Sequence, residues 1–261
     1  MTFELGLHLS NAHPQARAAD VVALASAAEE AGFDAVWATE HVVVGPDAAA
    51  AYGHVVHPLP LLAFIAARTR RVALGTSVLV APLHDPFLLA KQAADLQQLS
   101  GGRLRLGLGV GWHADEFRFM NVPFAGRGRR TDEAIAVMRA LWAGTPDFHG
   151  ALWQFEQATF GPLPEPPPQI WIGGASQRAA ARALALGATW HPILLGADDV
   201  ARAKARWPQL RIVPRVSAPA PPQLVEAVGA MRAAGADGVA AGLTVAPAEA
   251  LRALEQLAGQ L

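Results

Sequence analysis

An acidic residue and a histidine stand side by side at the end of a short apolar stretch, in the segment "WATEH". These residues are Glu40 and His41. Histidine carries a proton that is mobile near neutral pH, so it suits general acid–base catalysis. A single acid–histidine pair is more often a surface or capping feature. His8 and His191, however, also follow apolar stretches and are expected at the same depth, which predicts one rim where three histidines converge.

Such a set of histidines could also hold a metal ion. No local spacing brings the three together, and no carboxylate is tied to them in a known ligand pattern. We therefore expect no metal, and we take Glu40 and His41 as candidates for catalysis.

A second candidate site is the segment "IWIGGASQR", in which two glycines precede a serine at the start of a helix. Exposed amides and the helix dipole at such a junction favour a phosphate or carboxylate. An ordinary serine cap after a flexible turn is the alternative. Arg178 in the first helical turn would add a charge-assisted contact. The candidate residues are Gly173, Gly174, Ala175, Ser176 and Arg178.

Three glycines occupy every second position of the apolar run "LRLGLGVGWH", directly before Trp112 and His113. Their spacing is not that of a dinucleotide-binding loop. Glycines in a strand relieve crowding between side chains, or they leave the backbone bare so that a flat ligand can approach. In the preceding strand, "LGTSV", Gly75 permits a bulge and two hydroxyls follow it, which is typical of a barrel rim or of a polar strand end.

Eight apolar runs alternate with helix-period segments along the chain. Eight strand–helix units in about 250 residues are typical of a (β/α)8 TIM barrel, whereas a doubly wound sheet usually needs five or six strands. We therefore predict an α/β fold, a single barrel domain over residues 1–261. The expected strands are 3–9, 34–39, 71–80, 103–111, 168–174, 188–195, 211–217 and 236–243.

Two connections are longer than usual for such a fold. Residues 41–60 follow the second strand, and residues 143–168 read as a small hairpin with a stiff proline run. We expect both to fold over the barrel mouth as extended loops. Tyr52, His54, His57 and Trp153 are the candidates for lining a substrate pocket there.

Net charge, the length of the apolar runs and the cysteine count limit the kinds of partner that the sequence predicts. The net charge of −1 gives no reason to expect nucleic acid or a membrane surface, and no apolar run is long enough to span a bilayer. The chain has no cysteine, and it starts in a strand-like alternation rather than a signal peptide. We expect a cytoplasmic protein that acts on a small molecule.

Four segments taken together resemble the bacterial luciferase-like oxidoreductase superfamily, and most of all those members that use the deazaflavin coenzyme F-420. They cover almost the whole chain in order. The segments are "GFDAVWATEH", "LGTSVLVAPLHDPFLLAKQAADLQQLSGGRLRLGLGVGW", "FAGRGRRTDEAIAVMRALW" and "PPQIWIGGASQRAAARALALGATWHP".

The resemblance implies a barrel that holds a flavin or deazaflavin in its mouth. It implies a non-proline cis peptide at Ser77–Val78 behind the ring, an acid–histidine pair along the ring, and a turn that cradles phosphate. Trp112 and His113 would shape the substrate side and join Glu40 and His41 as catalytic candidates. The implied cofactor-binding residues are His8, Glu40, Thr76, Ser77, Val78, Gly109, Val110, Gly111, Gly173, Gly174, Ala175, Ser176 and Arg178.

Three departures limit what the resemblance implies. Val110 stands where luciferase-type flavin binders carry an arginine, and Trp112 stands where sugar-phosphate deazaflavin dehydrogenases carry a glutamate. Val44 stands where the latter carry an aromatic residue. Neither of those two reactions is therefore transferred to this chain.

The leading hypothesis is an oxidoreductase that moves a hydride between coenzyme F-420 and a small organic substrate. One alternative is a monooxygenase that uses reduced FMN supplied by a partner reductase. An alternative of another class is a barrel that binds the cofactor without catalysis. Relatives are often homodimers, although the helix faces show no distinctive patch.

Overall fold

Eight parallel strand positions follow one another around the sheet, in the order β10, β11, β1, β2, β3 with β4, β5, β8, β9. Isolated parallel bridges from Trp190 to Ile212 and from Ile193 to Arg215 join the β9 side to the β10 side. The predicted eight-stranded barrel is confirmed. The strands are β1 Glu4–His8, β2 Ala35–Ala38, β3 Ala73–Thr76, β4 Leu79–Val80, β5 Leu104–Gly109, β8 Gln169–Gly173, β9 Thr189–His191, β10 Arg215–Ala218 and β11 Gly238–Leu243.

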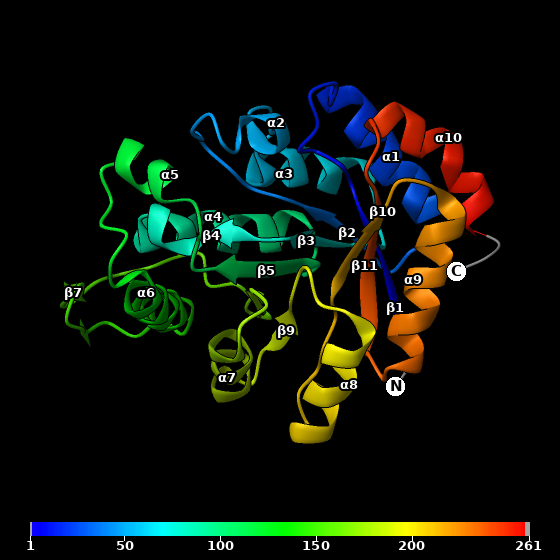
Figure 1. The fold of residues 1–261 in the computed structure, drawn as a ribbon. Helices are drawn as coiled ribbons and strands as arrows, with labels where there is room; N and C mark the ends of the chain where they lie inside the picture. Colours follow the sequence, from blue (N-terminus) through cyan, green and yellow to red (C-terminus); the bar gives the residue numbers. More distant parts are fainter. Residues whose placement is uncertain (1, 259–261) are drawn as a thin grey trace.

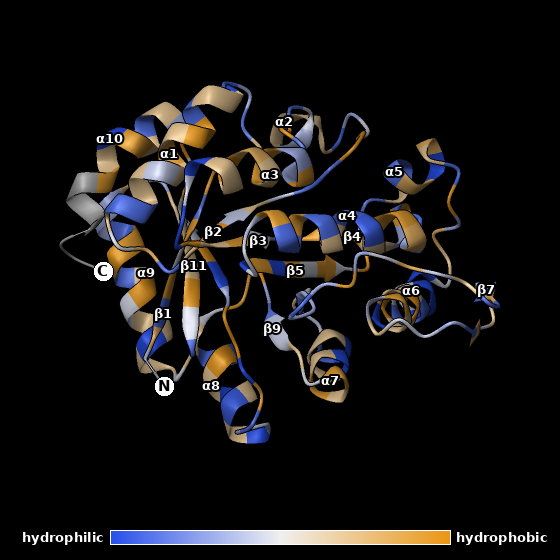
Figure 2. Cartoon of the chain, turned by 180° about the vertical axis from the view of Figure 1, so that it is seen from behind, coloured by the Kyte–Doolittle hydropathy of each residue, from blue (hydrophilic) through white to orange (hydrophobic). Residues whose placement is uncertain are grey.

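A helix follows each strand position in this computed structural model, which describes residues 2–258. Figure 1 shows these helices around the strands, and Figure 2 shows hydrophilic and hydrophobic residues alternating along α4, α7 and α8. This alternation is expected where one helix face packs on a sheet and the other meets water. The helices are α1 Ala18–Glu30, α3 Pro58–Arg68, α4 Pro86–Leu99, α6 Arg127–Trp142, α7 Gln177–Leu186, α8 Ala197–Arg206, α9 Pro221–Ala233 and α10 Pro247–Ala258.

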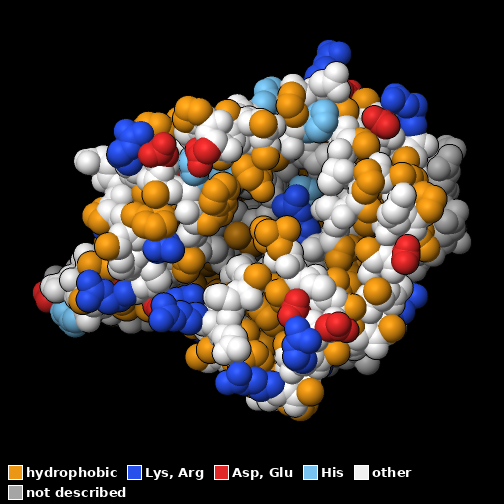
Figure 3. Space-filling view, in the orientation of Figure 1, with side chains coloured by type: hydrophobic (Ala, Val, Ile, Leu, Met, Phe, Trp, Pro, Cys, Tyr) orange, Lys and Arg blue, Asp and Glu red, His pale blue; other side chains and the backbone are white. Residues whose placement is uncertain are grey.

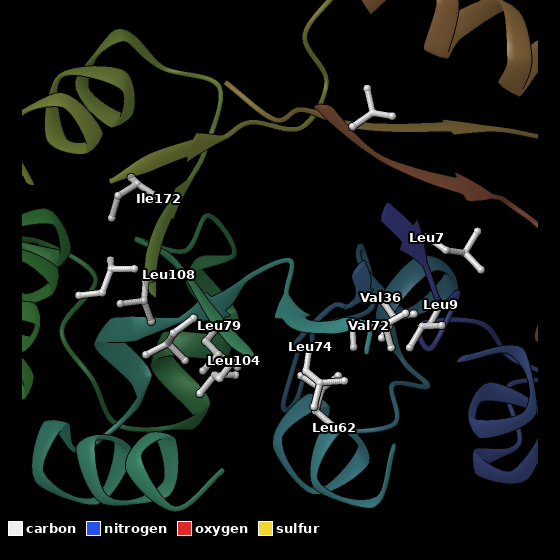
Figure 4. Close-up of a cluster of buried hydrophobic side chains, with 14 of the residues drawn as sticks. Leu7, Leu9, Val36, Leu62, Val72, Leu74, Leu79, Leu104, Leu108 and Ile172 are labelled. Atoms are coloured by element: carbon white, nitrogen blue, oxygen red, sulfur yellow. The ribbon is translucent and has the colours of Figure 1, made fainter. Parts of the chain in front are cut away.

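The core has two layers. The larger one lies between strands and helices, and Figure 4 shows ten of its side chains by name, among them Leu7, Val36, Leu74 and Leu104. A smaller cluster fills the barrel itself, with Trp37 and Trp171 at a centroid distance of 4.6 Å. The barrel is therefore plugged below its mouth, as is usual for this architecture.

The glycines of the barrel make room for side chains and backbone of the chain itself. A Cβ on Gly6 or Gly75 would overlap the indole of Trp37, and a Cβ on Gly107 would overlap the carbonyl of Thr76. A Cβ on Gly109 would lie 2.7 Å from Val78. Gly75 and Gly107 therefore relieve crowding, and the alternative that Gly107 leaves bare backbone for a ligand is wrong, because internal packing fills that space.

The predicted bulge lies just after Gly75. Gly75 pairs with Arg105, whereas Leu79 pairs with Leu108, so four steps along β3 and β4 oppose three along β5. One extra residue in a strand is a β-bulge, which redirects the chain locally. The peptide between Ser77 and Val78 in this bulge is cis, as the resemblance implied.

The first long connection is more ordered than expected. It contains the short helix α2 Ala49–Tyr52 and runs into α3, and neither helix was predicted. Residues 41–60 were expected as an extended loop, but Pro58 and Pro60 lie in the first turn of α3, where proline is tolerated. Two further short elements, η1 Ala81–Leu83 and α5 Ala114–Phe119, follow β4 and β5 at the carboxyl ends of those strands.

The second long connection does form a hairpin, β6 Phe148–His149 with β7 Gln154–Phe155, but it does not cover the mouth. Phe155 packs on Phe87 of α4, and the Lys91 ammonium of that helix donates to the Gly161 carbonyl. The hairpin therefore lies on the outer side of the helical layer, and Figure 1 shows β7 beyond α6 at the edge of the molecule. In the described part of the chain, no helix is both long and apolar enough to cross a membrane.

Candidate functional site

A cavity of about 180 Å³ opens at the carboxyl ends of the barrel strands, the face where TIM barrels carry their active sites. Figure 3 shows a central hollow with a basic side chain inside and hydrophobic side chains around it. Most of the lining is apolar or bare backbone. The lining residues are Thr39, Glu40, His41, Tyr52, Ser77, Val78, Val80, Gly109, Val110, Gly111, Trp112, Gly173, Gly174, His191, Ile193 and Arg215.

Two more cavities meet this one, because all three share Tyr52 and Arg215 in their lining. Their volumes are about 410 Å³ on the β10 side and about 330 Å³ on the β1 side. Ligand pockets in proteins usually measure about 300–1,000 Å³. The mouth as a whole therefore offers room for a molecule larger than the central cavity alone would hold.

His41 is held in a defined orientation by a buried carboxylate that the sequence did not suggest. Its Nδ1 lies 2.8 Å from Oε2 of Glu116 on α5, and Oε1 of Glu116 accepts from the Val42 amide at 2.7 Å. An ionised carboxylate only accepts, so the Nδ1 nitrogen of His41 donates to it, and in the neutral imidazole Nε2 is then the acceptor. The Nε2 atom has no hydrogen bond to any described residue, and His41 lines the cavity.

Glu40 has a different role from the one expected. Its carboxylate accepts from the Val80 amide at 2.6 Å and from His84 at 2.9 Å, and His57 pairs with it at 2.9 Å. Burial alone would raise the pKa of Glu40, but these hydrogen bonds outweigh it and hold the pKa at about 2. A carboxylate that is so fully engaged stays ionised and anchors the surrounding segments rather than transferring a proton.

The floor of the cavity is a chain of hydrogen bonds around Ser77. Its hydroxyl lies 2.9 Å from Nε2 of His191, and its carbonyl accepts from the Thr39 hydroxyl at 2.7 Å. The carbonyl of Val213 lies 2.6 Å from Nδ1 of His191, which fixes the proton on Nδ1 and makes Nε2 the acceptor. Burial lowers the pKa of His191 to about 4 and that of His8 well below its usual range, so both imidazoles are neutral.

Arg215 is the one arginine or lysine in the lining of these three cavities, and sequence reasoning missed it. Its Nη1 donates to the Thr39 hydroxyl at 2.9 Å across the mouth. The available signal was a charged residue inside an apolar strand segment, "RIVPRVS". Burial lowers the pKa of this guanidinium, but an arginine remains a cation under these conditions.

The three predicted histidines do lie at the barrel mouth, but in different environments. His41 and His191 line the central cavity, whereas the predicted cofactor-binding residue His8 lines the neighbouring cavity on the β1 side. Burial keeps the imidazoles of His8 and His191 neutral. Within the described part of the chain, no group of three or more His, Cys, Asp or Glu side chains is arranged to hold a metal ion.

The glycine segments reach the cavity as expected. Val110, Gly111 and Gly174 line it, and Gly111 and Gly174 have φ angles of +77° and +98°, which favour glycine. The guanidinium of Arg127 donates to the Gly111 carbonyl at 3.0 Å and supports this turn.

Several expected site residues do not line the central cavity. The Thr76 hydroxyl bonds to both backbone groups of Gly107, and the Ser176 hydroxyl accepts from the Ala179 amide as a helix cap. Ala175, Ser176 and Arg178 are exposed where α7 begins. They remain candidates only for a ligand that extends outward from Gly174.

Three other residues that were expected in the site make structural contacts away from the cavity instead. His113 accepts from the Gly45 amide at 2.8 Å and so anchors the loop after β2, not the cavity. His54 bonds to the Ala16 carbonyl, and Trp153 packs under Arg130 on the outside of α6. Tyr52 and Trp112 do line the cavity, and each of their rings contacts His41.

Comparisons with known proteins agree with this architecture. The family model described as luciferase-like monooxygenase matches residues 2–211. The oxygenase component of a flavin-dependent trigonelline monooxygenase from Acinetobacter baylyi is 30% identical over 212 residues, 77% of this chain and 57% of its own length. An F-420-dependent hydroxymycolic acid dehydrogenase from Mycobacterium tuberculosis is 32% identical over 190 residues, 71% of this chain and 52% of its own length.

Solved structures share the fold at lower identity. An F-420-dependent secondary alcohol dehydrogenase, in complex with an F-420–acetone adduct, superposes with a TM-score of 0.82 at 16% identity, over 98% of both chains. A monooxygenase from Streptomyces bottropensis gives a TM-score of 0.79 at 21% identity, over 100% of this chain and 98% of its own. These likenesses show the TIM-barrel fold. The chain belongs to the luciferase-like monooxygenase family.

Relatives of this chain include proteins that depend on F-420 and on flavin, so a ring of that kind is the relevant comparison for the mouth. The Val78 side chain and the backbone of Gly109, Gly111 and Gly173 line the side of the cavity formed by β4, β5 and β8. The polar side chains lie on the floor, on the His41 side and, with Arg215, on the β10 side of the cavity. A ring with apolar faces and a polar edge matches this distribution of groups.

Proposed function

We propose that this protein is an oxidoreductase that binds a deazaflavin, coenzyme F-420, at the barrel mouth and transfers a hydride between it and a small organic substrate. The observation that carries the proposal is the His41–Glu116 pair. It presents one oriented imidazole nitrogen to an otherwise apolar cavity at the catalytic face of the barrel. The bound cofactor would supply the redox chemistry, and the protein supplies binding, orientation and proton transfer.

The residues of the chain then have separate roles. Val78 and the glycines of β5 and β8 form the wall that would hold the ring, and Ser77 is fixed beneath it by Thr39 and His191. His41 accepts or returns a proton through Nε2, because Glu116 keeps the proton of the free imidazole on Nδ1. Tyr52 and Trp112 pack beside His41, whose side chain is buried.

The preference for the deazaflavin rests on sequence resemblance and on Val110. Val110 lines the cavity at the position where luciferase-type flavin binders carry an arginine. A reaction of reduced FMN with oxygen is the second candidate, since related chains include a flavin-dependent trigonelline monooxygenase and a 4-hydroxyprotoasukamycin monooxygenase.

Titration of the purified protein with coenzyme F-420 and with FMN, followed by fluorescence, tests the proposal. We expect saturable binding of F-420 at least about tenfold tighter than that of FMN, a difference of about 1.4 kcal/mol. The protein loaded with each reduced cofactor is then mixed with a substrate panel in the presence and absence of oxygen. Oxygen-dependent product with FMN alone would favour the monooxygenase. Tight binding without turnover on any substrate would favour a non-catalytic binding protein.

A further inference from the structure

Arg215 stands where the three cavities of the mouth meet. It comes from β10, whereas the apolar wall suited to a ring is built from β4, β5 and β8. The cavities on its other side are lined by the hydroxyl residues Ser217 and Thr244 and by apolar side chains such as Met231 and Leu243. The guanidinium therefore faces the space beside the ring wall, where a second molecule would lie.

The charge of Arg215 has no acidic counterpart. Among the described residues, no carboxylate forms an ion pair with the Arg215 guanidinium, and the one hydrogen bond of that guanidinium goes to the neutral hydroxyl of Thr39. Glu40 is the one acidic residue in the lining of the three cavities, and His57, His84 and the Val80 amide already occupy its carboxylate. A partly buried cation without a counter-ion is costly, so this site favours an anionic ligand.

The shape of the space adds a second constraint. Tyr52 lines all three cavities, and its ring lies 4.2 Å from His41 and 6.0 Å from Trp112. Aromatic walls favour a flat partner, and the planar fork of a guanidinium matches a carboxylate. Arg215, Tyr52 and Trp112 all line the same cavity as His41.

We infer that Arg215 binds a carboxylate group of the substrate, so that the mouth selects small, flat carboxylic acids and holds them beside Tyr52 within reach of His41. This inference rests on the proposed function, because it assigns the ring wall to the cofactor and the Arg215 side to the substrate. It makes Arg215 a specificity-determining residue.

Calorimetric titration of the cofactor-loaded protein with benzoate and with its neutral analogue benzamide tests the assignment. We expect benzoate to bind about 10- to 100-fold more tightly than benzamide, the range for a hydrogen bond to a charged group. Arg215→Gln should remove this preference and leave benzamide affinity within about twofold. Arg215→Lys should keep part of it, because an ammonium retains the charge without the fork.

Arg202→Gln is the matched control, since it removes the same charge from the exposed surface of α8, where Arg202 pairs with Asp199. It should bind both probes like the unaltered protein. Equal affinity of that protein for benzoate and benzamide would overturn the inference. So would a loss of benzoate binding in Arg202→Gln as large as in Arg215→Gln.

Cofactor titrations separate this inference from the proposed function. Arg215→Gln should bind the cofactor within about threefold of the unaltered protein. A loss of tenfold or more would assign Arg215 to the cofactor and overturn the inference. If neither cofactor binds but Arg215-dependent benzoate binding persists in the cofactor-free protein, the proposed function fails and the carboxylate site stands.

Discussion

The hydrogen bond between His41 and Glu116 determines which imidazole nitrogen can take a proton. Glu116 holds two donors at once, the Nδ1 nitrogen of His41 and the Val42 amide, at 2.8 and 2.7 Å. Because a backbone amide can only donate, the oxygen that faces Val42 must remain an acceptor in any variant that keeps this geometry. The group that faces His41 then decides the tautomer.

Glu116→Gln should therefore reverse the tautomer of His41. The amide oxygen stays with Val42, the amide NH₂ turns toward Nδ1, and the imidazole proton moves to Nε2 on the cavity side. We expect single-turnover rates with a substrate from the panel to fall about 100-fold or more while cofactor affinity is kept. Nitrogen-15 NMR of the imidazole should show protonation at Nε2.

The neighbouring carboxylate gives the control. Asp115 is half-exposed on the same helix and pairs with Arg118, so Asp115→Asn should leave both the rate and the tautomer unchanged. An unchanged rate in Glu116→Gln, together with a proton that stays on Nδ1, would rule out the orienting role of Glu116.

At the scale of the elements, the bulge between β3 and β4 determines how closely β5 packs against them. The hydroxyl of Thr76 bonds to the amide and the carbonyl of Gly107, both at 2.8 Å, so the two strands approach closely before Ser77 and Val78 turn toward the cavity. Val78 then packs against Gly109 and Gly173 on the strands beside it. The glycines thus serve the cofactor wall indirectly, by admitting the residue that forms it.

Gly107→Ala should be strongly destabilising, because its Cβ would overlap the Thr76 carbonyl and backbone cannot easily move aside. We expect the free energy of unfolding in urea to fall by about 1–3 kcal/mol or more. Gly229→Ala is the control. Gly229 is exposed within α9, has open space around its Cα, and should gain about 0.5–1 kcal/mol. Equal effects at both positions would contradict this account of the glycines.

Periodicity was sufficient to predict the eight strands, since each is an apolar run bounded by turn residues. It could not predict α3, because two prolines in the first turn look the same in a loop as at a helix start. Sequence reasoning identified Glu40 and His41 because they directly follow a predicted strand. It could not identify Glu116 as the partner of His41, because the barrel brings these residues together across 75 positions of sequence.

At the scale of the whole molecule, two buried groups at the barrel mouth, His191 and Glu40, make the free energy of unfolding depend on pH. His191 is neutral in the native protein with a pKa of about 4, chiefly because of burial. In the unfolded chain its pKa returns to about 6.5. Between these two values the unfolded state binds more protons, so the free energy of unfolding falls as the pH falls from about 6.5 to 4. This one group accounts for roughly 3 kcal/mol.

Glu40 continues the same trend at lower pH. Its native pKa of about 2 lies below the ordinary value of 4.5, so its stabilising effect is present above pH 4.5 and is lost as the pH falls toward 2. In urea unfolding at a series of pH values, we expect the protein to lose stability over both windows. Glu40→Gln should lower stability at neutral pH, because the charged partner of His57 and His84 is gone, and should show a shallower loss between pH 4.5 and 3.

Glu156→Gln provides the comparison, since Glu156 is 73% exposed on the hairpin and contributes no buried ion pair. Its acid profile should run parallel to that of the unaltered protein. If the Glu40→Gln profile also ran parallel between pH 4.5 and 3, the buried carboxylate would not be the group that titrates there. The loops after β2 and β4 would then be held in place by packing alone. A shallower Glu40→Gln profile, in contrast, means that the ionised Glu40 side chain holds both loops, through His57 and His84, against the barrel beneath the proposed cofactor site.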